Sequence, residues 1–514
     1  MTNPSPRLGA STPLPDGVGA PPVVPTGVGI VHLGWGAFHR AHQALYTQDA
    51  MAASGDLTWG ILGDVERTPA LVPALREQDG RYTVLTVGQD DDGAAVEHAQ
   101  VVASVLDVAY PGDETPRLLA AMAAPSTHLI TLTVTEKGYC RDADGSLDLT
   151  QVAPDTAALA AELCGGTATR PAATAIGLLV RGLAARYQAN GSPVTVLSCD
   201  NMAHNGTVLK AMVDQFVAAT GAACAGTTPD AECAQVAAFR TWIAAATTWP
   251  SSMVDRITPA VTPRTLDRIE AVLGARDEAA ISAEPFRQWV IEDNFAAPRP
   301  AWELAGAQIV AADVVNSWEE AKLRMLNGTH SLIAYAGRLF GYATMAEAVV
   351  APEIAEHARA YMFGDALPSV TPPTGADLPA YGEGLLARFA NPATGHSTRQ
   401  VSTDGSQKIP FRWGGAATSA LAEGRVPAGI AFGLAAWSEF VRRAVTGGVD
   451  LGDPAGAAAL TAVVTEQGDD VEGVARALIA LPGILPGQAG TDPALVAAVV
   501  GHAKALAAAS TGLL

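Results

Sequence analysis

Short apolar runs rich in β-branched residues alternate with helical stretches through the first 200 residues of the chain. These runs predict strands over Val28–Leu33, Trp59–Val65, Tyr82–Val87, Leu129–Val134 and Val194–Ser198. An Ala- and Leu-rich stretch from about Ala172 to Ala189 predicts a helix before the last of these strands. Such an alternation of strands and helices indicates an α/β fold with a doubly wound sheet.

The pattern changes after about residue 300, where helical periodicity dominates. Helices are predicted over Trp318–Phe340, Met345–Met362, Ile430–Thr446, Ala457–Gln467 and Ala494–Ala509. The first 25 residues are rich in Pro, Gly and Ser and lack the apolar stretch of a signal peptide. The chain is therefore expected to consist of a flexible tail (1–25), an α/β domain (26–300) and a mainly helical domain (301–514).

Composition narrows the class of protein. The 514 residues are 49% hydrophobic and 16% charged, which excludes overall disorder, and the formal net charge is -20. Nucleic acid and anionic membranes need a basic surface, so neither is expected as a partner. Five scattered cysteines without CxxC pairing fit reduced thiols, and the apolar windows are too short to span a membrane. A globular, cytoplasmic protein is expected, with its oligomeric state left open.

The first predicted strand leads into a glycine-containing turn, Gly34-Trp-Gly36-Ala-Phe-His-Arg40, and a helix is predicted to follow as far as Asp49. A strand, a GxG turn and a helix open the βαβ unit that binds dinucleotides. Its glycines let the backbone approach the pyrophosphate, and the helix N-terminus donates hydrogen bonds. The third glycine of GxGxxG is missing, so an ordinary glycine turn explains this motif equally well.

Acidic residues at the end of the second strand bear on the cofactor. Asp64 or Glu66 could accept hydrogen bonds from the adenosine ribose, which favours NAD over a cofactor with a 2′-phosphate. Arg67, the next residue, is positively charged and weakens this expected preference for NAD. Ligands of doubly wound sheets bind beyond the carboxyl ends of the strands, which makes Thr135 and Glu136 further candidates for cofactor binding.

The segment from Trp318 to His330 carries polar residues on one predicted helix face. At 3.6 residues per turn, this face spans roughly 140° and also contains leucines, so it is expected to be buried. Its polar residues are Glu319, Lys322, Asn327 and His330. Polar groups on a buried face are costly unless they pair with one another or bind a ligand.

These residue types suit the oxidation of an alcohol by a nicotinamide. The reaction needs a base for the hydroxyl proton and donors for the alkoxide that forms. Because burial lowers the pKa of a lysine, Lys322 is a candidate base that needs no metal. Asn201 and Asn327 are candidate donors, and His330 could position a sugar hydroxyl. A solvated lysine beside a satisfied core histidine is the alternative interpretation.

Several stretches together resemble the long-chain mannitol dehydrogenase family of polyol and hexonate dehydrogenases, from about Val28 to Val441. They are Gly36–Ala44, Ser198–Asn201 with Asn205-Gly206, Met253–Pro259, Trp289–Asp293, Arg299-Pro300 and Lys322–His330. The resemblance implies an NAD-binding Rossmann-type domain, a mainly helical domain and a metal-independent active site between them. It also implies that Lys322 is the general base, that Asn201 and Asn327 form an oxyanion hole, and that His330 contacts substrate.

The resemblance extends to further residues. Glu319 matches the position that the family associates with proton passage, and Asp255 lies in a motif that borders the substrate. The family's fingerprint is GxGxFxRAH, so the missing third glycine is no departure. The cofactor residues implied by this fingerprint are Gly34, Gly36, Phe38 and Arg40.

Substrate choice within the family depends on the stretches Arg388–Pro392, His396–Gln400 and Asp404–Pro410. They look more like the fructuronate reductase (D-mannonate oxidoreductase) branch, because mannitol 2-dehydrogenases tend to have an arginine in place of Lys408. A carboxylate substrate needs a local cation, for which Lys408 and Arg399 are the candidates. Mannitol and fructose are the alternative substrates. A non-catalytic NAD-binding sensor is a further alternative, although it should have lost the base or the amide donors.

Overall fold

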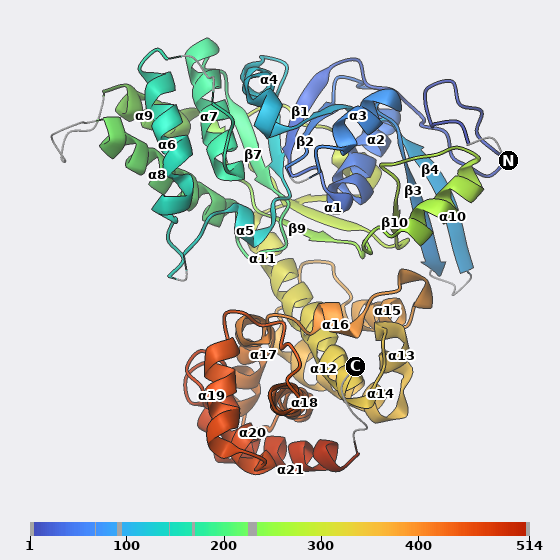
Figure 1. Ribbon diagram of the computed structural model, residues 1–514, viewed down its shortest axis with the longest axis vertical. Helices are drawn as coiled ribbons and strands as arrows, with labels where there is room; N and C mark the ends of the chain where they lie inside the picture. Colours follow the sequence, from blue (N-terminus) through green and yellow to red (C-terminus); the bar gives the residue numbers. More distant parts are fainter. Residues whose placement is uncertain are drawn as a thin grey trace. The chain divides into compact units, whose positions relative to one another are not determined.

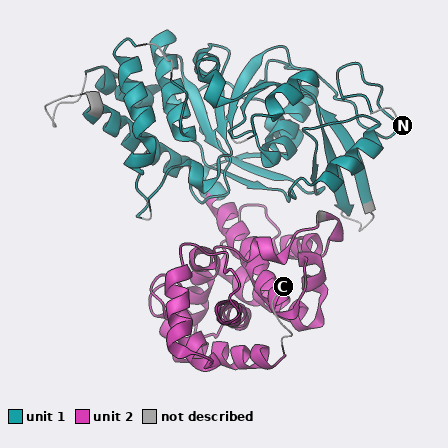
Figure 2. Ribbon diagram, in the orientation of Figure 1, with its two compact units in different colours: residues 1–315 teal, residues 316–514 magenta. Residues whose placement is uncertain are grey.

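The computed structural model describes residues 5–66, 68–89, 95–142, 144–166, 170–224 and 234–509. The chain divides into two compact units, Met1–Val315 (unit 1) and Asn316–Leu514 (unit 2) (Figure 2). This division falls after the boundary expected at residue 300. The reason is strand pairing, because β12 (Gln308–Val310) lies parallel to β11 (Gln288–Glu292) and so completes a sheet of unit 1.

A six-stranded parallel sheet forms the centre of unit 1, in the order β5-β2-β1-β6-β7-β8. Its strands are β1 (Val28–Leu33), β2 (Gly60–Asp64), β5 (Val105–Ala109), β6 (Leu129–Leu132), β7 (Val194–Ser198) and β8 (Thr247–Thr248). The chain runs outward from β1 to one edge and then returns to build the other half from β6. This is the strand order of a Rossmann fold, and it confirms the predicted doubly wound α/β sheet.

The remaining strands form two small sheets, in the orders β10-β3-β4 and β12-β11-β9. Their strands not yet given are β3 (Tyr82–Gln89), β4 (Ala95–Val102), β9 (Ser252–Asp255) and β10 (Ile281–Ala283). The run Tyr82–Val87 is therefore a strand as predicted, but it lies outside the main sheet. It pairs antiparallel with β4 from Tyr82 to Gln89, a partner that the apolar pattern alone does not identify.

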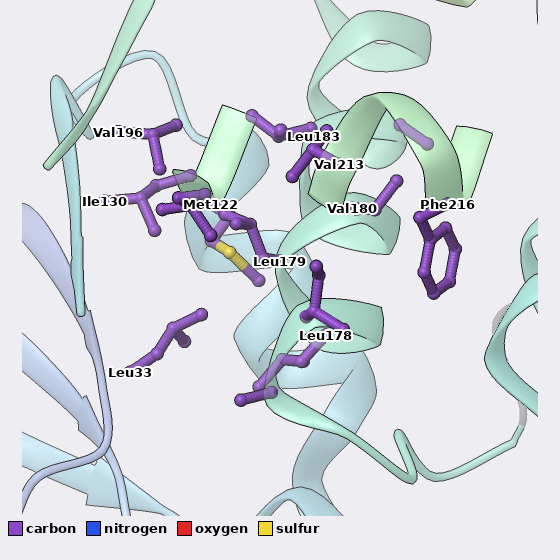
Figure 3. Close-up of a cluster of buried hydrophobic side chains, with 14 of the residues drawn as sticks. Leu33, Met122, Ile130, Leu178, Leu179, Val180, Leu183, Val196, Val213 and Phe216 are labelled. Atoms are coloured by element: carbon purple, nitrogen blue, oxygen red, sulfur yellow. The ribbon is translucent and has the colours of Figure 1, made fainter. Parts of the chain in front are cut away.

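Helices cover both faces of the main sheet (Figure 1). The longer ones are α2 (Gln43–Ser54), α4 (Pro111–Ala123), α6 (Leu149–Leu163), α7 (Ala175–Ala189), α8 (Asn205–Cys224), α9 (Ala234–Ala246) and α10 (Pro263–Leu273). The shorter ones are α1 (Ala37–Ala41), α3 (Leu71–Glu77), α5 (Thr135–Gly138) and η1 (Trp302–Ala305). Alternating side chains of β1 feed two cores, because Val31 and Leu33 pack with α7 whereas Ile30 packs with α2. Figure 3 shows part of the first core, around Met122 of α4.

The N-terminal segment differs from the prediction of a flexible tail. The N–H of Leu8 donates to Arg276 O at 2.9 Å, and that of Gly19 donates to Ala99 O at 2.8 Å. Leu8 is only 1% exposed and packs into a small apolar cluster. Over residues 5–25 the prediction is therefore corrected. A Pro- and Gly-rich composition gave no sign that backbone groups here pair with two distant segments.

Unit 2 is helical, as predicted. Helix α11 (Ala312–Ala321) begins in unit 1 and continues into unit 2. The other α-helices of unit 2 are α12 (Thr329–Phe340), α13 (Met345–Val350), α14 (Pro352–Arg359), α15 (Leu378–Phe389), α16 (Thr398–Val401), α17 (Gly405–Ala422), α18 (Ala428–Thr446), α19 (Ala457–Gln467), α20 (Val471–Ile479) and α21 (Pro493–Ala509). Two π-helices, η2 (Lys322–Gly328) and η3 (Ala360–Ala366), and the short 3-10 helices η4 (Leu367–Ser369), η5 (Pro392–Thr394) and η6 (Ala489–Thr491) complete it. Helix α18 is buried over most of its surface and packs against α12, α20 and α21, which makes it the core helix of this unit. Among the described residues, no helix has the length and apolarity that crossing a membrane requires.

Candidate active site

The glycine turn after β1 lies where the strand order reverses, between β1 and β6. Gly34 has φ +84°, and a Cβ on it would come within 2.3 Å of Thr133 O, so only glycine fits. The hydroxyl of Thr133 donates to Gly34 O at 2.8 Å. Beneath the turn, the buried ring of His32 lies 2.8 Å from Thr133 Oγ1, and burial lowers its pKa to about 3. The turn therefore presents its backbone at a fixed position, as dinucleotide binding requires.

Asp64 ends β2 beside this turn and is only 1% exposed. Burial raises the pKa of its carboxyl well above the ordinary value, and the charge of Glu66 adds to the rise. The N–H of Gly34 approaches the carboxylate and offsets part of this effect, but neither oxygen receives a full hydrogen bond from the described residues. A buried acceptor at this strand end suits ribose hydroxyls. Arg67 lies outside the described residues.

The other residues of the fingerprint brace the first helix. Gly36 is the N-cap of α1, and Phe38 stacks on His42 with 5.0 Å between the ring centroids. Arg40 is buried and donates to Ala279 O, so its guanidinium joins α1 to the segment before β10. Burial lowers the pKa of this guanidinium to about 10. The hydrogen bonds of Arg40 thus support the turn from behind, and a contact with the cofactor itself stays a prediction.

Two strand ends carry the remaining candidates of unit 1. Thr135 and Glu136 begin α5, which two residues separate from the end of β6, and Asn201 lies exposed in the loop after β7. Between them, Asp200 accepts the N–H of Thr135 at 2.7 Å and the hydroxyl of Tyr139 at 3.0 Å. These two bonds link the turn after β6 directly to the loop after β7.

Asn205 is a residue whose role the sequence did not reveal. Its fully buried amide donates to Asp200 O at 2.9 Å and to Ser252 O at 2.8 Å, and its oxygen accepts the N–H of Ser252 at 3.0 Å. It thereby anchors the loop that carries Asn201. The sequence analysis included Asn205-Gly206 only as part of the family resemblance. The burial of the Asn205 amide shows that Asn205, and not the exposed Asn201, has a structural role.

Asp255 ends β9 and is only 5% exposed. Its neighbour Arg256, which the sequence analysis did not select, donates to Glu284 O at 2.8 and 3.0 Å and also to Ala41 O. Burial lowers the pKa of Arg256 to about 10. This arginine ties the end of β9 to α1 and to the segment after β10, which fixes the position of Asp255.

In unit 2, the helix predicted over Trp318–Phe340 is interrupted by the π-helix η2. Lys322 opens η2 and is 7% exposed, while Asn327 near its end is half-buried. Hydrogen bonds in a π-helix run from i to i+5, so the helical wheel drawn at 3.6 residues per turn does not apply between these residues. The prediction of one continuous α-helical face is corrected accordingly. Such π-segments occur frequently at functional sites.

Side chains from other helices donate hydrogen bonds to carbonyl groups of η2. The hydroxyl of Tyr361 donates to Arg324 O at 2.7 Å, and the indole of Trp413 donates to Gly328 O at 3.0 Å. Arg412 donates to Asn327 O at 3.1 Å and to the hydroxyl of Ser331 at 2.7 Å. The π-helix is therefore stabilised by tertiary hydrogen bonds.

His330, just after η2, has a buried ring that stacks on Phe389 at 4.9 Å and meets His396 edge-on at 4.7 Å. Burial and then the positive charges around it, including Arg412, Arg388 and Lys408, hold its pKa well below the ordinary value. The imidazole is thus neutral at physiological pH. Its buried Nε2 atom has no hydrogen-bond partner among the described residues, as expected of an atom that binds a ligand.

The two candidate cations for a carboxylate differ in their surroundings. Lys408 of α17 lies near His330, donates to Thr403 Oγ1 at 3.2 Å and pairs with Asp404 at 3.7 Å. Arg399 of α16 is exposed, and its charge acts on Arg338, whose pKa burial and this neighbour both lower. The cations that join Lys408 near His330 are instead Arg388 of α15 and Arg412, which lies one helical turn further along α17. Within the described residues, no group of three or more His, Cys, Asp or Glu side chains could hold a metal ion.

The fold and the glycine turn at its switch point define a dinucleotide-binding enzyme of the α/β class. The chain belongs to the mannitol dehydrogenase family. The family's Rossmann domain matches residues 28–304, and its C-terminal domain matches residues 314–506. This confirms the family predicted from the sequence motifs.

Known relatives agree with this assignment. The chain is 42% identical over 433 residues to D-mannonate oxidoreductase of Escherichia coli (strain K12), which covers 83% of this chain and 82% of the relative. It is 37% identical over 414 residues to mannitol 2-dehydrogenase of Cereibacter sphaeroides, covering 80% of each. Among solved structures, the ternary complex of Pseudomonas fluorescens mannitol 2-dehydrogenase with NAD and D-mannitol matches with a TM-score of 0.79 at 31% identity, over 98% of this chain and 97% of that one.

These findings confirm the prediction of an NAD-dependent dehydrogenase and set aside the non-catalytic sensor. The residues of unit 1 fit this cofactor. Gly34 occupies a position that no Cβ can take, and Asp64 offers a buried acceptor at the end of β2.

Proposed function

We propose that this enzyme interconverts D-mannonate and D-fructuronate, as a fructuronate reductase. The observation that carries the proposal is the set of positive side chains around His330, namely Arg388, Lys408 and Arg412. An anionic substrate approaching a chain of net charge -20 needs such a local concentration of cations. The 42% identity to a D-mannonate oxidoreductase supports the same choice.

The reacting carbon is handled by the residues predicted from the sequence. NAD supplies the hydride acceptor when it is bound. In the oxidation direction, Lys322 Nζ takes the proton of the substrate hydroxyl while the amides of Asn201 and Asn327 donate hydrogen bonds to the oxygen. In the reduction direction, Lys322 returns the proton to the same oxygen. Glu319, three residues before Lys322, passes that proton to or from solvent.

The far end of the substrate determines the specificity. Fructuronate carries a carboxylate there, whereas fructose carries a neutral hydroxymethyl group. Lys408 and Arg412 share a face of α17 and can donate charge-assisted hydrogen bonds to a carboxylate. The unpartnered Nε2 of His330 and the carboxylate of Asp255 are assigned to hydroxyls of the sugar chain. Arg399 is assigned only a long-range electrostatic contribution, since it is exposed.

Mannitol 2-dehydrogenase activity is the second candidate. Asp404 and Thr403 already engage Lys408, which lowers the positive charge available to a carboxylate. If these contacts neutralise Lys408, its ammonium group would bind a hydroxyl that both sugars possess and would not distinguish a carboxylate.

An assay of NADH oxidation with fructuronate and with fructose separates the two activities. Two hydrogen bonds from cations to a carboxylate should favour fructuronate by more than about 100-fold in kcat/KM. Faster turnover of fructose would assign the chain to the mannitol 2-dehydrogenases. D-mannonate and D-mannitol with NAD test the reverse direction in the same way.

A further inference from the structure

The turn that follows β6 has a strained backbone. Thr135 has φ +64°, in the left-handed region that a β-branched residue rarely adopts. Strain of this kind persists only where the surrounding structure holds it in place. The N–H of Thr135 donates a hydrogen bond to Oδ1 of Asp200 at 2.7 Å. The carboxylate of Asp200, which follows the neighbouring strand β7, therefore holds the strained residue in place.

The remaining polar atoms of Asp200 are also engaged. Its Oδ2 accepts the hydroxyl of Tyr139 at 3.0 Å, and that hydroxyl lies 2.6 Å from Ser198 Oγ. Its backbone oxygen accepts the amide of Asn205 at 2.9 Å. With both carboxylate oxygens occupied and the residue 6% exposed, Asp200 is oriented to hold protein groups and not a ligand.

The strained turn also borders the dinucleotide turn. A Cβ on Gly34 would lie 2.3 Å from Thr133 O and 3.1 Å from a methyl group of Val134. The residues immediately before Thr135 therefore form the surface against which Gly34 packs. If Thr135 relaxed to a negative φ, this surface would move, and the backbone that faces the cofactor would move with it.

We propose that Asp200 is a positioning residue that fixes the turn Val134–Glu136 against Gly34 and thereby sets the affinity for NAD. Asp200 touches neither cofactor nor substrate in this role. It also places Asn201, the next residue, at a defined point of the same loop. The inference rests on NAD binding, so it is independent of which sugar the enzyme reduces.

Binding of NADH without sugar, measured by its fluorescence, tests the proposal. Asp200→Ala should weaken the NADH Kd by about 10-fold or more, because both the hydrogen bond and the strained turn are lost. Asp200→Asn should keep the Kd within about threefold, since its amide oxygen still accepts the N–H of Thr135. Tyr139→Phe is the matched control. It removes the bond to the other carboxylate oxygen and should also stay within about threefold.

A second substitution separates positioning from general stability. Glycine adopts a positive φ without strain, so Thr135→Gly should make Asp200 dispensable. We expect the double variant D200A/T135G to bind NADH within about threefold of T135G alone. Wild-type affinity in folded D200A would overturn the proposal. Two results for the double variant would also overturn the proposal: NADH binding more than about tenfold weaker than that of T135G, or failure to fold where T135G folds. If D200A alone does not fold, the comparison of the double variant with T135G tests the proposal in its place.

Discussion

The hydroxyl of Tyr361 offers a direct test of how the π-helix η2 places its polar residues. Tyr361 is fully buried, donates to Arg324 O at 2.7 Å and lies 3.3 Å from Arg412 O. The substitution Tyr361→Phe keeps the ring and removes only the donor. A carbonyl of η2 then loses its tertiary partner, so the π-helix becomes less favourable relative to a regular α-helix.

The expected magnitude follows from that single bond. Leaving a buried acceptor without its donor costs about 1–3 kcal/mol. Since each 1 kcal/mol lowers Tm by about 2–4 °C in a unit of this size, Tm should fall by roughly 2–12 °C. Relaxation of η2 turns Asn327 and His330 relative to Lys322, and kcat should fall by about 10-fold. The NADH Kd should not change, because the Gly34 turn belongs to unit 1.

Thermal unfolding, steady-state kinetics and NADH binding of Y361F provide these three values. Tyr335→Phe is the matched control, since Tyr335 is another buried tyrosine of unit 2 and lies on α12, outside η2. We expect the control to retain wild-type kcat. If Y361F retained wild-type kcat as well, the π-helix would have no part in positioning the catalytic residues, and the reasoning would be refuted.

The remaining predictions concern four other features. Lys322→Ala should lower kcat by at least about 100-fold while NADH binding survives, and near-normal turnover would remove Lys322 from the mechanism. Neutralising Asp64 and Glu66 together should erode a preference for NADH over NADPH, and equal kcat/KM for both cofactors in the unmodified enzyme would refute their assignment. Lys408→Met should lower kcat/KM for fructuronate far more than for fructose, and equal losses would mean that Lys408 contacts a hydroxyl. Burial raises the pKa of Asp200 to about 6 in the folded state, above its unfolded value of 3.8. The folded state therefore binds a proton more tightly, so the carboxyl costs stability as pH rises through this window, by up to about 3 kcal/mol. Urea unfolding from pH 4 to 7 should show the wild type losing this stability relative to D200N, and parallel curves would contradict it.

The sequence predicted those parts of the fold that depend on local pattern. The strands at Val28–Leu33 and Val194–Ser198 have the predicted bounds, because they are apolar, rich in β-branched residues and buried on both faces. Partners distant in sequence were not predictable in this way. The run at Tyr82 joined a separate sheet, and Leu8 found a buried position among residues of two distant segments.

The candidate site shows the same distinction. The residue types of the segment from Glu319 to His330 indicated buried polar chemistry, but their geometry did not follow from the sequence. Leucines spaced for an α-helix masked a π-helix whose carbonyl partners, Tyr361 and Trp413, come from other helices. Arg412 was missed for the same reason, since its place near His330 depends on how α17 packs against η2.

The strained turn at Thr135 and the π-helix η2 are held in place in the same way. Thr135 is strained and η2 is a π-helix, and both segments contain residues predicted to bind the cofactor or carry out the reaction. Each is held by a buried polar side chain from elsewhere in its own unit, Asp200 for the turn and Tyr361 for the π-helix. Strain costs about 1–3 kcal/mol at one residue, so it survives only where such a partner offsets it. The partners of irregular backbone are thus as informative about function as the residues that meet the ligand.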